Sequence, residues 1–534
     1  MRRAPKRSAQ HLQSRIVRPS SDRAPARRAT GPHLHHRLDV ATVTALARDD
    51  ACVLGVDSST GSTKVEILSL ADGRLIDQAR SPHPATTPPV SEQHPDTWWQ
   101  AFLHCLDQVA ENLSSVRAIS ISGQQHGLVV LDGADQPLRP AKLWNDTTSA
   151  LESQQMIDLL GRQRWAHEVG SLPGPSFTVT KLKWLSDHEP ATFGSVRRVG
   201  LPHDYLNLKI TGRWTTDRGD ASGTGYWSPR EGRYRADLLS EVGLDIDSIE
   251  FPRVANPFAS IGTVSSHELT NRGVASDTLV APGSGDNMSA ALGLGVGPGD
   301  LVVSLGTSGT AYAVSNTPTS DETGLVAGFA DATGRYLPLV CTLNATKVTE
   351  SFRALLDVDH TEFDRLAMAA PQGANGLTLV PYFDGERTPN LPNARGLLSG
   401  LRAPMNRPQI ARAAVEGVTC GLLDGVDALL NAGVPLPGRF FLIGGGARSQ
   451  AFATSFASLS GRSVLIPEAD ETVARGAAVQ AACVATGETP TSIAERWKLD
   501  RAETVEPLIH EEAESAEAVR ARYRHVASLA GELW

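Results

Sequence analysis

The stretch VLGVDSSTGSTKVEIL, Val53 to Leu68, places one aspartate and a run of small hydroxylated residues between two apolar runs. The apolar runs have the composition of β-strands, and the Gly/Ser/Thr segment between them predicts a tight hairpin turn. A second segment, LVVSLGTSGTAYAV from Leu301 to Val314, has the same form. Two such hairpins far apart in one sequence indicate a chain with two duplicated halves.

The two hairpin loops have a composition suited to phosphate. Backbone N–H groups without bulky side chains, together with hydroxyls, can hold phosphate oxygens, although tight geometry alone would explain either loop by itself. The two copies differ at one informative position, because Asp57 of the first hairpin is matched by Ser304 of the second. Since Mg²⁺ binds through one or two carboxylates plus substrate phosphates, a single aspartate between two phosphate loops predicts a Mg²⁺ anchor.

Two common nucleotide-binding motifs are excluded. The Walker spacing G-x-x-x-x-G-K-[ST] is missing around Lys64. In FFLIGGGARSQAF, Phe440 to Phe452, Ser449 stands where a Rossmann motif needs its third glycine. The segment still predicts a buried strand, Phe440 to Ile443, that breaks at three glycines into a helix. Those glycines are either a tight turn or a place where adenine or ribose approaches the bare backbone.

Length and composition set broader limits. A chain of 534 residues exceeds what one hydrophobic core supports, so we expect at least two domains. The net charge of -9 argues against nucleic acid or an anionic membrane as a partner and favours small solutes. Five scattered cysteines without a CxxC pattern suit a reduced compartment, and neither a long apolar run nor an export signal is visible, so we expect a cytoplasmic protein. From Cys52 onward, short strands alternate with amphipathic helices, which is typical of α/β architecture.

The first 48 residues differ from the rest. They are rich in Lys and Arg, contain Asp22 and Asp39 as their only acids, and have Pro, Ser and His interleaved. This composition predicts a disordered basic tail, with a nucleic-acid-binding arm as the alternative.

Seven segments in one order carry a resemblance to a known family. They are GVDSSTGSTK, ISGQQHGLVVLD, LWND, GSGDNMSAALGLG, SLGTSG, DGERTPN and LIGGGARS. From about Val53 to Ala482 the chain resembles the FGGY carbohydrate kinases. The resemblance implies two actin-like ATPase domains of ribonuclease H-like topology, residues 51–297 and 298–534, with a catalytic cleft between them. It also implies ATP-dependent phosphorylation of a ketose, with D-xylulose expected and D-ribulose, L-xylulose or sedoheptulose as alternatives.

The resemblance also implies an ATP site. The ATP-binding residues that we expect on this basis are Ser59, Thr60, Ser62, Lys64, Gly306, Thr307, Gly444, Gly445 and Gly446. Asp57 is then expected to help hold Mg²⁺ and to take part in catalysis.

Sugar recognition is expected in the segments QQHG, Gln124 to Gly127, and LWND, Leu143 to Asp146. A polyol needs several fixed donors and acceptors, and these segments supply imidazole, amide, carboxylate and an indole face. Taken alone, His126 would be a structural histidine and Trp144 a core aromatic. The resemblance instead makes a substrate-binding set of Gln125, His126, Trp144, Asn145, Asp146 and Asn287. Gln125 and Thr148 depart from the Met and Arg usual in the family, which leaves the ketose open.

Asp286 follows a glycine-rich turn and precedes a small-residue helix. By itself it predicts a helix N-cap, and by resemblance it is the catalytic base. We expect it to keep an ordinary pKa of about 4 and to be ionised at pH 7. DGERTPN, Asp384 to Asn390, is compatible with a solvated loop or with a structural ion pair between Glu386 and Arg387 and their surroundings. The resemblance implies a place near the cleft without fixing a role. The C-terminal segment predicts an amphipathic helix.

Two other function classes remain open from the sequence. An actin-like ATPase could hydrolyse ATP without sugar transfer, and a sugar-responsive regulator would need a DNA-binding module, for which the tail offers no compact three-helix pattern. The sugar segments and Asp286 favour the kinase. Its expected partners are a small ketose and ATP, with a homodimer possible.

Overall fold

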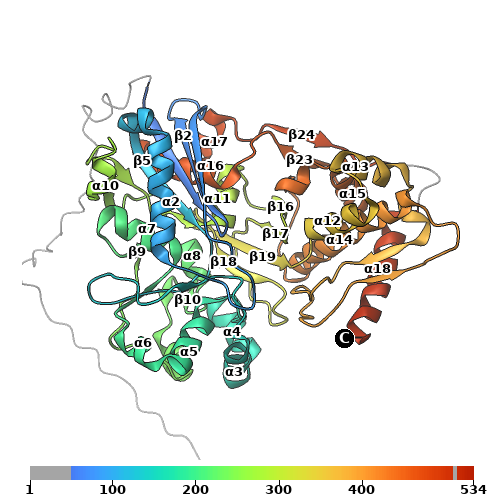
Figure 1. Cartoon of the computed structure of the whole chain (residues 1–534), viewed down its shortest axis with the longest axis horizontal. Coiled ribbons are helices and arrows are strands. Elements are labelled where there is room, and N and C mark those ends of the chain that lie inside the picture. The colour runs from blue at the N-terminus through green and yellow to red at the C-terminus, as the bar shows by residue number, and fades with distance from the viewer. Residues whose placement is uncertain (1–49, 509–513, 534) are drawn as a thin grey trace, which may run out of the picture. The chain divides into compact units, whose positions relative to one another are not determined.

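The computed structural model describes residues 50–508 and 514–533, which belong to one compact unit. Two seven-stranded mixed sheets, flanked by helices, make up its framework (Figure 1). The basic tail expected over residues 1–48 lies outside the described residues.

The first sheet is built on the quoted hairpin. Its order is β13 (Gly262–Thr263), β14 (Leu279–Val280), β5 (Val116–Gly123), β1 (Cys52–Ser58), β2 (Ser62–Ser69) and β3 (Leu75–Pro82), with β15 (Ser284–Gly285) beside β5. Strands β1 and β2 pair antiparallel, with Asp57 opposite Lys64, while β1 and β5 pair parallel. Every residue of β1 is buried, which explains its near-continuous apolar run.

The second sheet repeats this plan. Its order is β18 (Ala327–Ala330), β19 (Tyr336–Thr342), β17 (Gly309–Ala313), β16 (Leu301–Leu305), β22 (Phe440–Ile443), β23 (Val464–Pro467) and β24 (Ala502–Val505). The β16–β17 hairpin is antiparallel and β16 pairs parallel with β22, just as β1 does with β5. The duplication indicated by the two hairpin segments is therefore present in the fold.

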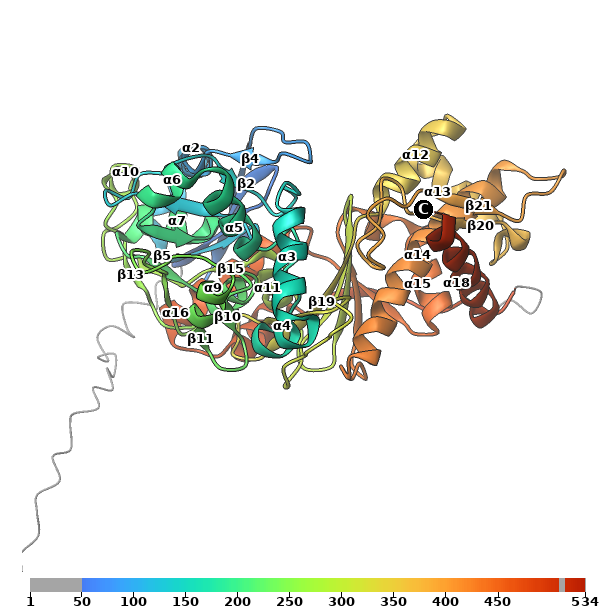
Figure 2. The same cartoon turned by 90° about the horizontal axis from the view of Figure 1, so that it is seen from below.

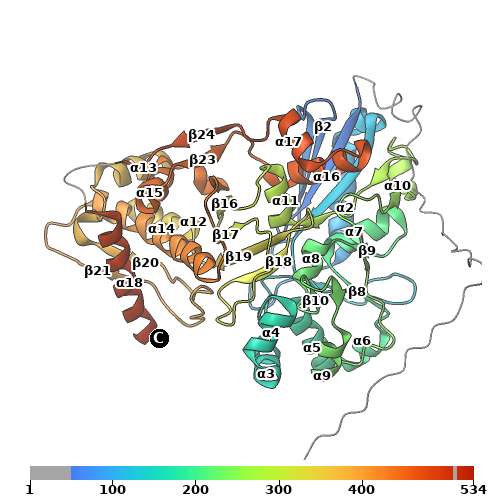
Figure 3. The ribbon, with the colours of Figure 1, turned by 180° about the vertical axis from the view of Figure 1, so that it is seen from behind.

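Helices late in the chain cover the first sheet. Helix α16 (Thr472–Thr486) packs against β1 and β5, and α17 (Pro490–Trp497) packs beside α16, as Figure 3 shows from behind. A shared core joins Val53 and Ala118 of the sheet to Val479 and Trp497 of these helices. The backbones approach closely, since a Cβ at Gly55 would lie 2.0 Å from the Ala474 carbonyl oxygen. Small residues in both elements make this contact possible.

Helix α11 (Asp286–Gly293) packs along α16. A Cβ at Gly293 would lie 2.1 Å from the Thr472 carbonyl oxygen, and one at Gly476 would lie 1.7 Å from that of Ser289. The two helices therefore meet backbone to backbone, a distance that only glycine permits.

The remaining helices fall into two groups. Those packed in or around the second-sheet core are α12 (Thr346–Leu356), α13 (His360–Ala369), α14 (Arg407–Asn431), α15 (Gln450–Ser460) and α18 (Ala516–Leu533), as Figure 2 shows. Those of the first half are α2 (Pro95–Gln108), α3 (Ala150–Leu160), α4 (Arg162–Val169), α5 (Thr178–His188), α6 (Pro190–Ser195), α7 (Pro202–Thr211), α8 (Arg218–Ser222), α9 (Ala236–Glu241) and α10 (His267–Thr270).

Five two-stranded pairs complete the described structure. They are β4 (Glu92–Gln93) with β7 (Ala141–Lys142), β6 (Val129–Leu131) with β8 (Arg198–Gly200), β9 (Thr215–Thr216) with β12 (Arg253–Val254), β10 (Trp227–Ser228) with β11 (Arg233–Tyr234), and β20 (Thr378–Val380) with β21 (Leu397–Ser399).

The α/β fold expected from the sequence is confirmed, including the strand Phe440–Ile443 before the three glycines and the amphipathic C-terminal helix, which is α18. Over residues 50–508 and 514–533, no helix is both long enough and apolar enough to cross a bilayer.

Candidate active site

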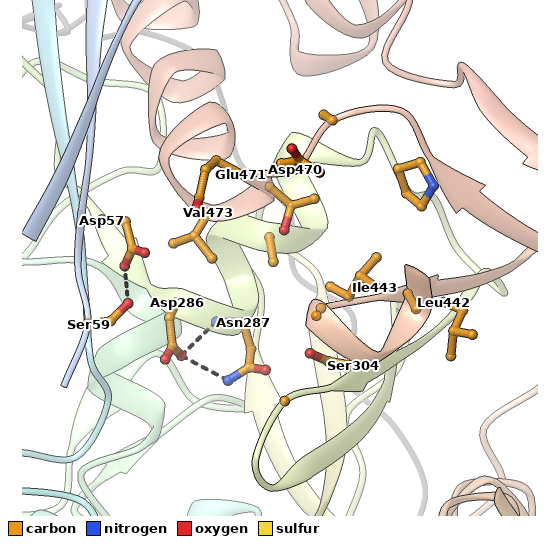
Figure 4. A pocket seen from close by; sticks show the side chains of 18 of the residues that line it. Asp57, Ser59, Asp286, Asn287, Ser304, Leu442, Ile443, Asp470, Glu471 and Val473 are labelled. Atoms are coloured by element: carbon orange, nitrogen blue, oxygen red, sulfur yellow. Dashed lines mark hydrogen bonds between the residues drawn. The ribbon is translucent and has the colours of Figure 1, made fainter. Parts of the chain in front are cut away.

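A cavity of about 570 Å³ lies where the two hairpin loops, α11 and the start of α16 come together (Figure 4). Its lining includes Asp57, Ser59, Lys64, Asp286, Asn287, Ser304, Gly306, Tyr312, Leu442, Ile443, Gly444, Gly445, Arg448, Asp470, Glu471 and Val473. In Figure 4 the acidic side chains Asp57 and Asp286 lie at one end, and Leu442 and Ile443 lie at the other. The cavity thus has a charged end and an apolar end.

The first hairpin loop supplies the charged end. The Asp57 carboxylate is buried and accepts a hydrogen bond from the Ser59 hydroxyl. Lys64 Nζ lies 3.4 Å from Asp57 Oδ2 and 2.8 Å from Glu471 Oε2. Burial raises the pKa of Asp57, an effect that the nearby Lys64 opposes. One lysine thus serves two carboxylates, which leaves this end of the cavity short of positive charge.

The second hairpin loop and the glycine turn form the opposite wall. Gly306 accepts hydrogen bonds through its carbonyl from the backbone N–H and the hydroxyl of Thr346. Gly444 has φ of +85°, and a Cβ there would lie 2.7 Å from the Leu305 carbonyl oxygen. Glycine is therefore required at this position both for its conformation and for the close approach. The turn brings backbone without side chains to the cavity surface.

Asp286 stands between the cavity and the sugar segments. It is the first residue of α11, and the N-cap position belongs to Gly285, so the N-cap interpretation of Asp286 is wrong. Its Oδ1 accepts hydrogen bonds from the backbone N–H and the side-chain amide of Asn287, each at 2.8 Å. The same amide donates to Gln125 Oε1 at 3.0 Å. This network fixes the carboxylate next to the QQHG segment.

His126 is held in an unusual backbone conformation next to this network. Its φ is +67°, in the left-handed region that non-glycine residues seldom occupy. Nδ1 lies 2.6 Å from the Gly223 carbonyl oxygen, and because a carbonyl only accepts, Nδ1 carries the hydrogen. Burial lowers the pKa of His126 to about 3, so the ring is neutral and Nε2 presents a lone pair. A neutral imidazole acceptor of this kind suits a sugar hydroxyl.

The LWND segment connects to the first hairpin loop. Trp144 Nε1 donates to Thr60 Oγ1 at 2.8 Å, and Thr60 in turn donates to Gln124 Oε1 at 3.2 Å. Asn145 has a buried side-chain oxygen that finds no hydrogen-bond partner in the part of the chain that the structure describes. The segment therefore joins the expected phosphate loop to the expected sugar segment.

Two family models match this chain: the N-terminal domain of the FGGY family of carbohydrate kinases over residues 52–293, and the C-terminal domain of that family over residues 301–485. The chain belongs to the FGGY family of carbohydrate kinases. Membership makes the protein an ATP-dependent sugar kinase.

Individual relatives are similar over almost their whole length. A xylulose kinase from Streptomyces rubiginosus is 46% identical over 468 residues, which are 87% of this chain and 95% of that protein. One from Streptomyces coelicolor is 45% identical over 469 residues, covering 88% and 95%. The crystal structure of xylulose kinase from Bifidobacterium adolescentis has a TM-score of 0.77 and 39% identity, covering 89% of this chain and 99% of that one.

The electrostatics of this FGGY kinase correct one expectation. Asp286 does not keep an ordinary pKa, because burial, and secondarily the negative charge of Asp57, raise its pKa to about 7. The sequence placed Asp286 at a helix start and could not show how deeply that helix start is enclosed. Near neutral pH the carboxyl group of this kinase is therefore poised between its two protonation states.

Several expected site residues lie outside the cavity lining. Asp146 is fully buried and accepts from the Ser91 N–H at 2.9 Å and from the Thr148 N–H at 3.1 Å, so it supports the loop that carries Trp144. Ser62 accepts from Arg80 on β3. Thr307, which is exposed, and Gly446, which is buried, are also outside the cavity lining, and a Cβ at Gly446 would meet Leu305 and Thr346. The same holds for Thr60, Gln125, His126, Trp144 and Asn145. All of them lie within the loops that the resemblance identified.

One cavity wall of the kinase was not predicted from the sequence. Residues Ile466, Pro467, Ala469, Asp470, Glu471, Thr472 and Val473 line it between β23 and α16. Their segment, IPEADETV, has neither a glycine cluster nor a hydroxyl run. Tyr312 on β17 also lines the cavity, and its buried hydroxyl has no hydrogen-bond partner within residues 50–508 and 514–533. Tyr312 follows the second hairpin turn directly in the sequence, so its place next to an expected phosphate loop could have indicated it as a cavity residue.

The DGERTPN loop also differs from expectation. Glu386 is buried and accepts from the Leu343 N–H and from Asn344, and no ion pair joins it to Arg387 in the described part of the chain. For Glu386 both the solvated loop and the ion pair with Arg387 are therefore wrong, although Asp384, Pro389 and Asn390 of the loop are exposed.

Proposed function

We propose that this carbohydrate kinase transfers the γ-phosphoryl group of ATP to D-xylulose and forms D-xylulose 5-phosphate and ADP. The observation that carries the proposal is the position of Asp286, which shares hydrogen bonds through Asn287 with Gln125 and also lines the cavity between the hairpin loops. Similarity to proteins named xylulose kinase, over 95% of their length, supports the choice of sugar.

Asp286 has the geometry and the charge of a general base. We infer that it accepts the proton of the 5-hydroxyl as that oxygen attacks phosphorus. A pKa near 7 is well matched to this task, because a base is most effective when its pKa lies near the working pH. In a loose transition state, positioning and charge neutralisation do most of the remaining catalysis.

The nucleotide is proposed to occupy the cavity from its charged end to its apolar end. Backbone around Ser59, Thr60 and Gly306 would face the phosphates, with Lys64 near them. Gly444 and Gly445, next to Leu442 and Ile443, would face adenosine, because the turn offers a flat surface without side chains. The buried Ser62 and Gly446 would then support these loops from behind, while the exposed Thr307 would face the phosphates.

Mg²⁺ fits the residues at the charged end. Asp57 is a buried carboxylate whose pKa is raised by burial even though Lys64 lies nearby, and oxygen ligands of this kind suit Mg²⁺. We propose that Asp57 holds the ion, with Glu471 close by. When bound with ATP, Mg²⁺ neutralises charge on the phosphate oxygens.

The sugar is proposed to lie between Asp286 and His126, with Trp144, Asn145 and Asn287 around it. The acceptor Nε2 of His126 and the amides supply the fixed hydrogen-bonding groups that a polyol needs. Gln125 and Thr148 differ from the family's usual residues, so D-ribulose, L-xylulose and sedoheptulose are the competing substrates.

We also propose two domains, residues 51–297 and 298–534, that follow a tail over residues 1–48. A cytoplasmic location is consistent with the five cysteines, which are all free. A homodimer is compatible with the chain and is to be tested by light scattering.

A coupled ADP-release assay across a panel of ketoses and polyols tests the substrate. We expect D-xylulose with MgATP to give the highest kcat/KM. A clear preference for glycerol, D-ribulose or another sugar would refute the proposal. ADP release without any sugar would support an ATPase instead.

A further inference from the structure

The loop Asp384 to Asn390 is rigidly attached to β19. The buried Glu386 carboxylate accepts from the Leu343 N–H at 2.6 Å and from Asn344 Nδ2 at 2.8 Å. Thr388 Oγ1 donates to the Cys341 carbonyl at 2.8 Å. Gly385 has φ of +90°, and a Cβ there would lie 2.4 Å from the Pro392 carbonyl oxygen. A loop built in this way presents the one long side chain between these anchors, Arg387, in a defined place.

Arg387 reaches from this loop toward the first half of the chain. Its Nη1 lies 3.5 Å from Ser176 Oγ. The side chain is half-buried, and no ion pair holds its guanidinium in the described part of the chain. A half-buried cation without a carboxylate is uncommon, since its desolvation is not offset by an opposite charge.

Ser176 marks the sugar end of the site. The next residue, Phe177, packs on the His126 ring with centroids 4.8 Å apart, and Thr178 Oγ1 donates to the His126 carbonyl at 3.0 Å. Arg387 also lies close enough to His126 for its positive charge to add to the lowering of the histidine pKa that burial causes. The guanidinium and the imidazole therefore face the same region from different parts of the chain.

The neighbouring groups include both acceptors and donors, since the buried amide nitrogens of Gln124 and Gln125 have no hydrogen-bond partner among the described residues. His126 offers a lone pair at Nε2, Asp286 offers carboxylate oxygens, and both Asn287 amide hydrogens are directed at Asp286 and Gln125. A ketose brings a carbonyl oxygen, which carries no hydrogen and can only accept. Arginine supplies N–H donors in a planar fork and has no acceptor. Arg387 thus supplies the donors that the ketone end of the sugar requires.

We propose that Arg387 binds the sugar, donating from its guanidinium to the carbonyl oxygen at C2 and the adjacent hydroxyl oxygen, at the end of the ketose opposite the 5-hydroxyl. This inference rests on the proposed function, since it assigns a contact within the same sugar site. Because Arg387 is anchored to the second sheet, the bound sugar links the two halves of the chain.

Steady-state kinetics of Arg387→Gln test the contact. We expect KM for D-xylulose to rise at least about tenfold, the effect of losing roughly 1.4 kcal/mol of binding, while KM for ATP changes less than twofold. Arg387→Lys keeps the charge and loses the fork, so it should recover only part of the affinity. Arg402→Gln is the matched control, because Arg402 is an exposed arginine in a following loop, and we expect no change in either KM.

A purely structural role predicts a different pattern. If Arg387 only joined the two halves through Ser176, Ser176→Ala would reproduce the effect of Arg387→Gln, both variants would lower Tm, and KM for ATP would rise with that for the sugar. That pattern, or an unchanged KM for the sugar, would overturn the inference. Calorimetric titration of the variant with D-xylulose alone gives a second reading, and we expect weaker binding without nucleotide.

The two proposals fail separately. If the wild-type enzyme prefers another sugar, the proposed function is wrong, whereas a wild-type preference for D-xylulose with a normal KM in Arg387→Gln refutes the Arg387 contact alone.

Discussion

Replacing Gly476 with alanine tests whether the backbone contact between α11 and α16 sets the position of Asp286, the proposed catalytic carboxylate. The added Cβ would lie 1.7 Å from the Ser289 carbonyl oxygen. Since non-bonded carbon and oxygen atoms seldom come closer than about 3.3 Å, the helices would have to separate by roughly 1.6 Å. Asp286 and Asn287 begin α11, so the displacement reaches the site directly.

Two opposing terms decide the effect on stability. Alanine in a helix is favoured over glycine by about 1 kcal/mol, whereas overpacking a close contact costs typically about 1 to 3 kcal/mol and sometimes more. Because the clash is with backbone, which cannot rotate away, we expect the overpacking term to exceed the propensity term. The free energy of unfolding should fall by about 1 to 2 kcal/mol. A misplacement of about 1 Å costs on the order of 10²-fold in rate, so kcat should fall by about 10- to 100-fold.

The assay combines thermal unfolding with ADP-release kinetics on the same preparations. Gly194→Ala is the control, because Gly194 also lies in a helix and a Cβ there would meet no atom within 4 Å. The control should keep its activity, and its Tm should stay the same or rise slightly, because the helix propensity of alanine is gained without a clash. If Gly476→Ala matches wild-type kcat and Tm, the α11–α16 contact does not position the site and this reasoning is wrong.

A pH profile of the wild-type enzyme and three further substitutions test the charged groups and the glycine turn. The pKa of Asp286 is raised to about 7, and its ionised form is the proposed base. We therefore expect kcat/KM for MgATP to fall about tenfold per pH unit below pH 7 and to level off above it. A flat profile from pH 5 to 8 would contradict this. Because the pKa of Asp286 is raised in the folded state, its carboxyl group lowers the free energy of unfolding as pH rises from 3.8 to about 7. Asp286→Asn removes this effect and should raise Tm at pH 8, while it should lower kcat by about 10²-fold. A variant that keeps a tenth of wild-type kcat would exclude the base assignment. Asp57→Ala should reduce turnover at least about 10²-fold while D-xylulose binding, measured by calorimetry without nucleotide, stays within twofold; equal loss of both would make Asp57 structural. Gly444 has φ of +85°, and a Cβ there would lie 2.7 Å from the Leu305 carbonyl oxygen. Gly444→Ala should therefore lower Tm and raise KM for ATP more than KM for the sugar. An unchanged KM for ATP would show that this turn is not part of the proposed adenosine site.

The parts of the fold that sequence reasoning identified are those with local causes. The hairpins at Val53–Leu68 and Leu301–Val314 follow from apolar runs and small turn residues next to one another in the chain. The strand before Gly444 follows from its apolar run and the three glycines. In each case neighbouring residues determine the structure, so a single sequence is sufficient.

What the sequence did not reveal depends on contacts between distant residues. The segment IPEADETV becomes a cavity wall only because α16 returns to the first sheet, and nothing within the segment specifies that. The pKa of Asp286 depends on burial by several elements and on the charge of Asp57. Glu386 and Arg387 are neighbours of opposite charge, which suggested an ion pair, but backbone donors bind the glutamate and the arginine extends to Ser176.

The packing of α16 and α17 on the first sheet has a consequence for synthesis on the ribosome. By the time β5 is complete at Gly123, Val53, Leu68 and Ala118 have been made, yet their partners lie between Ala478 and Leu499. At about 5 to 20 residues per second, the ribosome needs on the order of 20 to 70 s to reach those partners. During that interval one apolar face of the nascent sheet has no native cover, so we expect it to be where a chaperone engages the growing chain, and a truncation before Thr472 to leave a product that aggregates.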